Sequence, residues 1–311
     1  MTHTAPLPSS VHTTPPKARP LTNQADKPAQ LRPSDADLNR VEREPCVESV
    51  AFVRPLKHLT HDGAWRLAVL HDRPQAHLFW ITKGQGTLIL DGVKQGLSGH
   101  TVIYVPKGAL FALTTTPGVF GTVVGLRDEH ARYMPTKPVA LRVIDMGEQR
   151  SFAAHFDNLS REINTQSEGQ DVAVMAHAML TSVWLARQTL SQNATKPSAK
   201  ERIMSCLFET VSEHFAEGQG IGAIADRIGV TPTHLSRLCN ATLGLSSSKL
   251  LADRIFYEAR ALLADTRLTA SDISKQLGFS SPAYFTRAFQ AHVGQTPSAF
   301  RAEGAQISKV A

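Results

Sequence analysis

One short pattern occurs twice in the last third of this chain, and it limits the possible fold more than any other feature. Residues 221–229 and 270–278 each have the apolar spacing of a short helix that ends at a glycine. A hydroxyl residue, a proline and a second amphipathic segment follow each copy. A helix, a tight turn and a second helix form a helix-turn-helix motif. Two such motifs on one chain are typical of DNA-binding proteins.

The second helix of each copy has the features of a DNA-recognition helix. A threonine or serine followed by proline suits the N-cap and the first turn of a helix. The large apolar residues of these helices share one face, so the polar side chains point outward toward base edges or phosphates. Arg237 and Arg287 occupy matching places, and each can bind a guanine through two hydrogen bonds or hold a phosphate. The residues predicted to bind DNA are Thr231, Thr233, Ser236, Arg237, Asn240, Ser281, Pro282, Ala283, Thr286 and Arg287.

The segment between the two copies predicts a single linker helix. Residues 249–264 contain neither proline nor glycine. Sixteen helical residues span about 24 Å, while successive major-groove segments of DNA lie about 34 Å apart. A helix of this length would hold the two recognition helices at a nearly fixed separation, so one molecule could read two successive groove segments.

Four motifs mark residues 221–301, about a quarter of the chain: Arg254-Ile255-x3-Ala259-Arg260-x-Leu262-Leu263, Asp272-Ile273 to Gly278-Phe279, Tyr284-Phe285-Thr286-Arg287-x-Phe289, and Gly294-x-Thr296-Pro297-x2-Phe300-Arg301. With these motifs and the tandem repeat, the segment resembles the DNA-binding domain of AraC/XylS-type transcription regulators. The first copy departs from that family at Cys239, where a larger apolar residue is common. The resemblance implies a promoter-binding transcription factor, usually an activator that contacts RNA polymerase. It also implies base contacts by the outward residues of both recognition helices.

The first half of the chain predicts an antiparallel β-barrel or sandwich. Short apolar runs at residues 67–70, 78–81, 87–90 and 101–105 are separated by glycine-containing turns. The spacing Gly99-x6-Pro106-x-Gly108 resembles, more weakly, a motif of the cupin-like effector domains often attached to such regulators. The residues predicted to bind a small-molecule effector are His71, His77, Trp80 and Tyr104, with core packing as the alternative role of the two aromatic residues.

No metal or other cofactor is predicted. Metal-binding cupins place a histidine near position 111, where this chain has Phe111, and a second motif supplies two histidines and a glutamate. The matching places here hold His71, Arg73 and His77, which is fewer than the three or four converging ligands that a metal needs. Two alternatives stay open: a metal-dependent cupin enzyme fused to a DNA-binding module, and a ligand-independent regulator with a purely structural barrel.

Two stripes of apolar residues between these halves predict amphipathic helices. One consists of Phe152, Phe156, Leu159 and Ile163. The other consists of Val172, Met175, Met179 and Val183. A stripe can pack on the barrel or meet its copy in a homodimer, and the two interpretations can hold for different faces.

The sequence therefore predicts a multidomain chain of 311 residues with a cupin-like antiparallel β-barrel, a helical dimer region and an all-α tandem helix-turn-helix domain. Its net charge of +6 is compatible with a DNA partner. Three scattered cysteines and the lack of an apolar run of about 18–20 residues predict a cytoplasmic protein with no membrane segment. The predicted boundaries are 1–44 for a disordered tail, 45–147 for the effector domain, 148–190 for the helical region, 191–200 for a linker and 201–303 for the DNA-binding domain.

Overall fold

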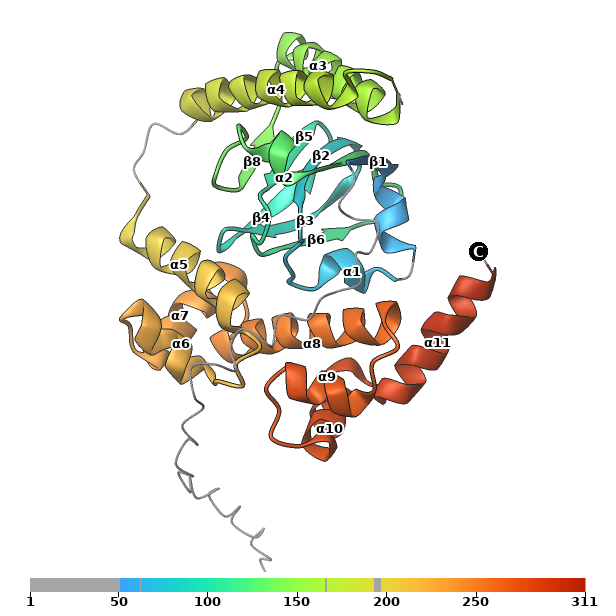
Figure 1. The fold of residues 1–311 in the computed structure, drawn as a ribbon. Coiled ribbons are helices and arrows are strands. Elements are labelled where there is room, and N and C mark those ends of the chain that lie inside the picture. Colours follow the sequence, from blue (N-terminus) through green and yellow to red (C-terminus); the bar gives the residue numbers. More distant parts are fainter. Residues whose placement is uncertain (1–50, 62, 166, 193–196, 311) are drawn as a thin grey trace, which may run out of the picture. The chain divides into compact units, whose positions relative to one another are not determined.

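The computed structural model describes residues 51–61, 63–165, 167–192 and 197–310 (Figure 1). The tail predicted for residues 1–44 lies outside this part of the chain, as does the middle of the linker predicted for 191–200. In the part that is described, no helix combines the length and the apolar character needed to cross a bilayer.

The first half of the described chain is built from two antiparallel sheets, which confirms the predicted antiparallel β class. The order of the larger sheet is β1 (Phe52–Pro55), β7 (Phe120–Leu126), β2 (Ala76–Lys83), β5 (Thr101–Val105) and β8 (Val139–Arg142). The order of the smaller sheet is β4 (Val93–Ser98), β3 (Gln85–Leu90) and β6 (Phe111–Thr115). Residues 52–142 are called the β domain below. It also contains the short helices η2 (Leu56–Thr60), α1 (Trp65–Ala68) and α2 (Asp128–Ala131).

The two faces of strand β2 serve two different cores. Phe79 and Ile81 point between the sheets, into a cluster that takes residues from both. Leu78 and Trp80 point to the other face of the larger sheet, because successive side chains of a strand alternate. The strand predicted for residues 67–70 is wrong, since residues 65–68 form helix α1. A run of four apolar residues fits one helical turn as well as a short strand.

Helices α3 (Met146–Asn164) and α4 (Gln170–Gln192) lie side by side and cover the outer face of the larger sheet (Figure 1). The predicted stripe of α3 packs on this sheet, and all four of its residues are buried. Helix α4 packs on the sheet through a face outside the predicted stripe, which consists of Val174, Ala178, Trp184 and Leu185. Its predicted stripe is largely exposed, with Val172 at 72% and Val183 at 46%.

The last third is all-helical, as predicted, and is called the helical domain below. The first motif consists of α6 (Ile221–Ile228) and α7 (Pro232–Leu243), supported by α5 (Ala199–His214). The second consists of α9 (Ala270–Gln276) and α10 (Pro282–Val293), followed by α11 (Pro297–Val310). The predicted linker helix is α8 (Ser247–Asp265), and its residues belong to the cores of both motifs.

Candidate DNA interface

The first recognition helix, α7, has a firm N-terminus and one buried face. The Thr231 side chain accepts a hydrogen bond of 3.2 Å from the backbone nitrogen of His234. Leu235 and Cys239 are fully buried. This burial leaves the polar face of the helix available, with Thr233, Arg237 and Asn240 exposed and Ser236 half-buried.

The second recognition helix, α10, repeats this arrangement. The Ser281 hydroxyl accepts a hydrogen bond of 3.2 Å from the backbone nitrogen of Tyr284. Phe285 and Phe289 are fully buried. The predicted contact residues Pro282, Ala283 and Arg287 are exposed. Thr286 is half-buried, and its hydroxyl donates to the carbonyl oxygen of Pro282 at 3.0 Å, so this donor is used within the helix.

The two helices correspond residue for residue at a constant offset of 50 positions, from their N-caps to their C-cap glycines. Gln290 therefore matches Asn240, and it is exposed in the same way. The sequence analysis includes Asn240 and misses Gln290, although the offset between the two prolines would have found it. An amide side chain at this place can bind adenine through two hydrogen bonds.

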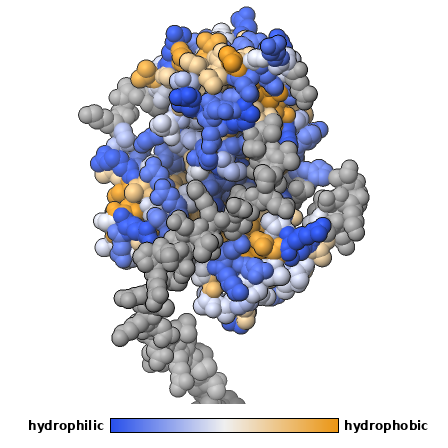
Figure 2. Space-filling model, in the orientation of Figure 1, coloured by the Kyte–Doolittle hydropathy of each residue, from blue (hydrophilic) through white to orange (hydrophobic). Residues whose placement is uncertain are grey.

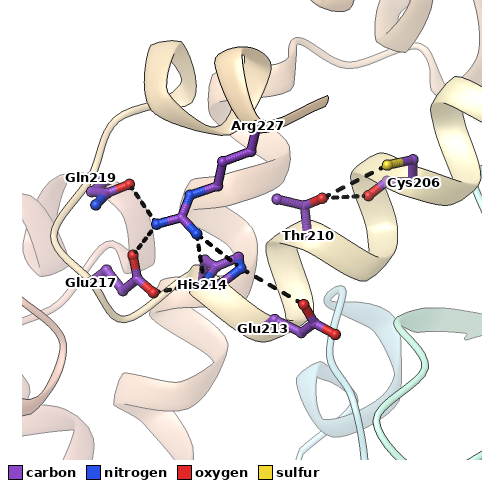
Figure 3. A network of polar contacts seen from close by, with 7 residues as sticks. All are labelled: Cys206, Thr210, Glu213, His214, Glu217, Gln219 and Arg227. Carbon is purple, nitrogen blue, oxygen red and sulfur yellow. Dashed lines mark hydrogen bonds and ion pairs between the residues drawn. The ribbon is translucent and has the colours of Figure 1, made fainter. Parts of the chain in front are cut away.

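A polar network fixes the first helix of the first motif to α5 (Figure 3). Arg227 on α6 donates to Glu217 at 2.7 Å and contacts the His214 ring at 3.1 Å. His214 and Glu217 are themselves 2.6 Å apart. These contacts anchor α6, which precedes the recognition helix, to the end of its supporting helix.

The second recognition helix is fixed to α8 by a half-buried contact between a histidine and a carboxylate. His292 on α10 lies 2.9 Å from Asp253 and stacks on Phe256 with ring centroids 4.7 Å apart. Burial raises the pKa of Asp253, but the hydrogen bonds from His292 and Lys249 outweigh it and hold this pKa below its ordinary value. The carboxylate therefore stays charged and keeps α10 against the linker helix.

Two buried histidines lie in the β domain, among the residues predicted to bind an effector. The Nδ1 atom of His71 is 2.8 Å from the carbonyl oxygen of Val69, and Arg73 donates to its Nε2 atom at 3.3 Å. Burial and the Arg73 charge lower the pKa of His71 well below its ordinary value. The same two causes lower the pKa of His77 to about 3. Both rings are therefore neutral at neutral pH, and both nitrogens of His71 are already engaged.

The four predicted effector residues do not come together. His77 lies next to Gln75, whose side-chain amide is buried without a hydrogen-bond partner. Trp80 and Tyr104 lie on the opposite face of the sheet, in the cluster with α3 and α4. Trp80 contacts the Phe152 ring there with centroids 5.0 Å apart. The placement of these two residues matches the packing alternative.

One group of side chains has the composition of a metal site. Glu129, His130 and Asp171 lie together, with the carboxylates exposed and His130 buried. The guanidinium of Arg127 pairs with both carboxylates, at 2.6 Å from Asp171. A cation already neutralises these acids, so we assign the group as an ion-pair network between α2 and α4.

Residues 224–303 match the family model of a helix-turn-helix domain. Over 88 residues the chain is 35% identical to the probable transcription factor PqrA of Proteus vulgaris. The matched segment covers 28% of this chain and 72% of PqrA. The chain belongs to the AraC family of transcription regulators. Over 151 residues it is also 28% identical to the arabinose operon regulatory protein of Escherichia coli, an AraC-family protein. This match covers 48% of the present chain and 51% of that protein. The chain thus spans about half the length of the first curated relatives that it matches.

Solved structures give weaker similarities to this AraC-family chain. The crystal structure of ToxT from Vibrio cholerae matches 81% of this chain and 96% of its own, with a TM-score of 0.42 and 14% identity. An AraC-type DNA-binding domain from Chromobacterium violaceum matches 32% of this chain and 93% of its own, with a TM-score of 0.29 and 33% identity.

Proposed function

We propose that this protein is a cytoplasmic transcription regulator that binds promoter DNA through both helix-turn-helix motifs. The observation that carries the proposal is the matched exposure of Arg237 and Arg287 on two recognition helices whose apolar faces are buried. Helix α8 has 19 residues, a length of about 28 Å, and joins the two motifs. The family resemblance further implies activation through RNA polymerase, which we take as the expected output.

Selection from randomised duplex DNA tests the proposal. The full chain should enrich one sequence, and affinity for it should exceed affinity for random DNA by about a thousandfold or more. A double variant, Arg237→Ala with Arg287→Ala, should lose this enrichment. Binding without enrichment that disappears steeply as salt increases would mean phosphate contacts alone, and the proposal would fail.

We further propose that the protein is a homodimer formed through the exposed face of α4. Six apolar residues, called the α4 stripe, follow one another at alternating steps of four and three, as in one seam of a coiled coil. Hydrophobic side chains gather over α3 and α4 in Figure 2. A patch of this length is normally covered by a partner, and a second copy covers it symmetrically. The α4 stripe consists of Val172, Ala176, Met179, Val183, Ala186 and Leu190.

Measuring the molar mass in solution decides the dimer proposal. The wild-type chain should sediment as a dimer, and Val183→Glu should sediment as a monomer because it places a charge in the middle of the stripe. Ala154→Glu is the matched control, since Ala154 is an exposed alanine on α3 outside the stripe. Equal masses for all three proteins would refute the α4 interface.

We further propose that a small-molecule effector binds near His71 and His77. The unpartnered amide of Gln75 supports this choice, because a buried polar group without a partner costs about 1–3 kcal/mol that a bound molecule can recover. A thermal-shift screen should therefore find compounds that stabilise the wild-type chain but not Gln75→Leu. Compounds that stabilise both proteins equally would place the effector elsewhere.

A further inference from the structure

Residues 65–73, called the latch below, join the β domain to the C-terminal end of α8. Arg66 forms a bidentate ion pair with Asp265, with nitrogen–oxygen distances of 3.0 and 2.6 Å. The Arg66 side chain is 16% exposed and that of Asp265 is 40% exposed, so the pair lies at the edge of the contact between the latch and α8. The latch thereby holds the point where α8 leads into the second motif.

The latch also contacts the middle of α8, through a buried charge. Asp72 pairs with Arg254, whose side chain is 2% exposed, and Arg254 donates to Glu258 at 3.0 Å. The guanidinium lies 3.6 Å over the Phe215 ring. Glu258 lies on α8 itself, so Asp72 is the acidic partner of Arg254 that comes from the β domain. Loss of Asp72 would therefore remove the charged contact between the latch and the middle of α8.

Aromatic rings connect the core of the β domain to α8 through the latch. The His71 ring lies 4.3 Å from Phe111, a core residue of β6, and stacks on Tyr257 of α8 at 4.4 Å. Trp65 contacts Tyr257 at 5.4 Å and Phe300 of α11 at 5.8 Å. A displacement of His71 would therefore act on α8 directly.

The first motif is docked to the β domain separately from the latch. Ser205 and Ser212 of α5 donate to Asp91 and to the carbonyl oxygen of Gly108, both at 2.6 Å. Leu110 and Ala112, which lie in the β domain outside the latch, belong to the same buried cluster as α5. Opening the latch would therefore free the C-terminal half of α8 and leave α5 in place.

We propose that the latch couples the β domain to the DNA-binding helices by setting the position of the second motif relative to the first. Its contacts lie on α8 and α11, whereas Arg237 and Arg287 remain exposed, so the latch positions the recognition helices and does not cover them. An effector near His71 and His77 would change DNA binding by opening or closing the latch. This last step rests on the proposed function.

Hydrogen exchange of the full chain without DNA tests the latch itself. Asp72→Asn should increase amide exchange in residues 65–73 and in the C-terminal half of α8 together, by about tenfold, the effect of a lost charged hydrogen bond. Exchange in α5 should stay unchanged. Asp128→Asn is the control, because it breaks an exposed ion pair of the β domain with Lys107. Unchanged exchange in α8 of Asp72→Asn would overturn the proposal.

A double-variant cycle checks the second contact of the latch. Arg66→Gln and Asp265→Asn should each increase exchange at the C-terminal end of α8, and the double variant should exchange no faster than the more affected single variant. Effects that multiply would mean that the two residues act independently, and this contact would then not be part of a latch.

Adding the selected duplex tests the coupling. Exchange in the latch should slow on DNA binding in the wild-type chain and not in Asp72→Asn, although both proteins should protect α7 and α10. If DNA protects these helices in the wild type but not the latch, the coupling is refuted and DNA binding stands. If no duplex binds the wild type, the proposed function fails, while the experiments without DNA still decide whether the latch exists.

Discussion

Arg287 is exposed on α10, and a guanidinium can bind the O6 and N7 atoms of a guanine through two hydrogen bonds. Arg287→Ala should cost about 1–3 kcal/mol of binding free energy and relax specificity at one base pair. Competition binding against single-base variants of the selected duplex measures both effects. Arg267→Ala, which removes an exposed arginine between α8 and α9, is the charge-matched control. An equal loss on every duplex would show that Arg287 holds a phosphate.

His77 makes the stability of the folded chain depend on pH. Its pKa is about 3 in the folded protein and about 6.5 in an unfolded chain, so between these values the unfolded chain binds the extra proton. The contribution of His77 to stability is therefore complete above pH 6.5. It falls with decreasing pH by at most about 1.4 kcal/mol per unit. Urea unfolding at pH 7.5, 6 and 5 measures this slope, which should be smaller in His77→Gln. An identical slope in the variant would contradict the prediction.

Two glycines at the elements' ends look alike in the sequence but have different surroundings. Gly229 and Gly278 are the turn glycines of the two motifs, with φ of +77° and +72°. A Cβ atom at Gly229 would meet nothing, whereas one at Gly278 would lie 2.3 Å from the backbone nitrogen of Gly218. Gly229→Ala should cost about 1–2 kcal/mol for its left-handed backbone. Gly278→Ala should cost clearly more, because the loop after α5 must also move. Equal losses in thermal unfolding would contradict this difference.

Features of the elements that depend on local sequence could be predicted, and those that depend on tertiary packing could not. The repeat, the linker helix and the outward residues of α7 and α10 follow from local periodicity, which the helices obey. The face that α4 buries depends on the packing of Trp184 and Ala178 against the larger sheet, which no local pattern encodes. The sequence could have predicted Gln290, because this residue matches Asn240. It could not have predicted that the sheet separates Trp80 from His77, because this separation depends on the register and alternation of β2.

At the scale of the whole molecule, a dimer through α4 would turn two weak DNA contacts into one strong one. Joining two binding units raises the affinity for a two-site partner by about 10²–10⁴-fold without any new contact. Val183→Glu should therefore weaken binding to a duplex with two copies of the selected site by this factor. It should leave binding to a duplex with one copy unchanged, because α7 and α10 are untouched. Ala154→Glu should bind both duplexes like the wild type. A loss of equal size on the one-copy duplex would mean that the α4 stripe supports the fold of each subunit and does not join two of them.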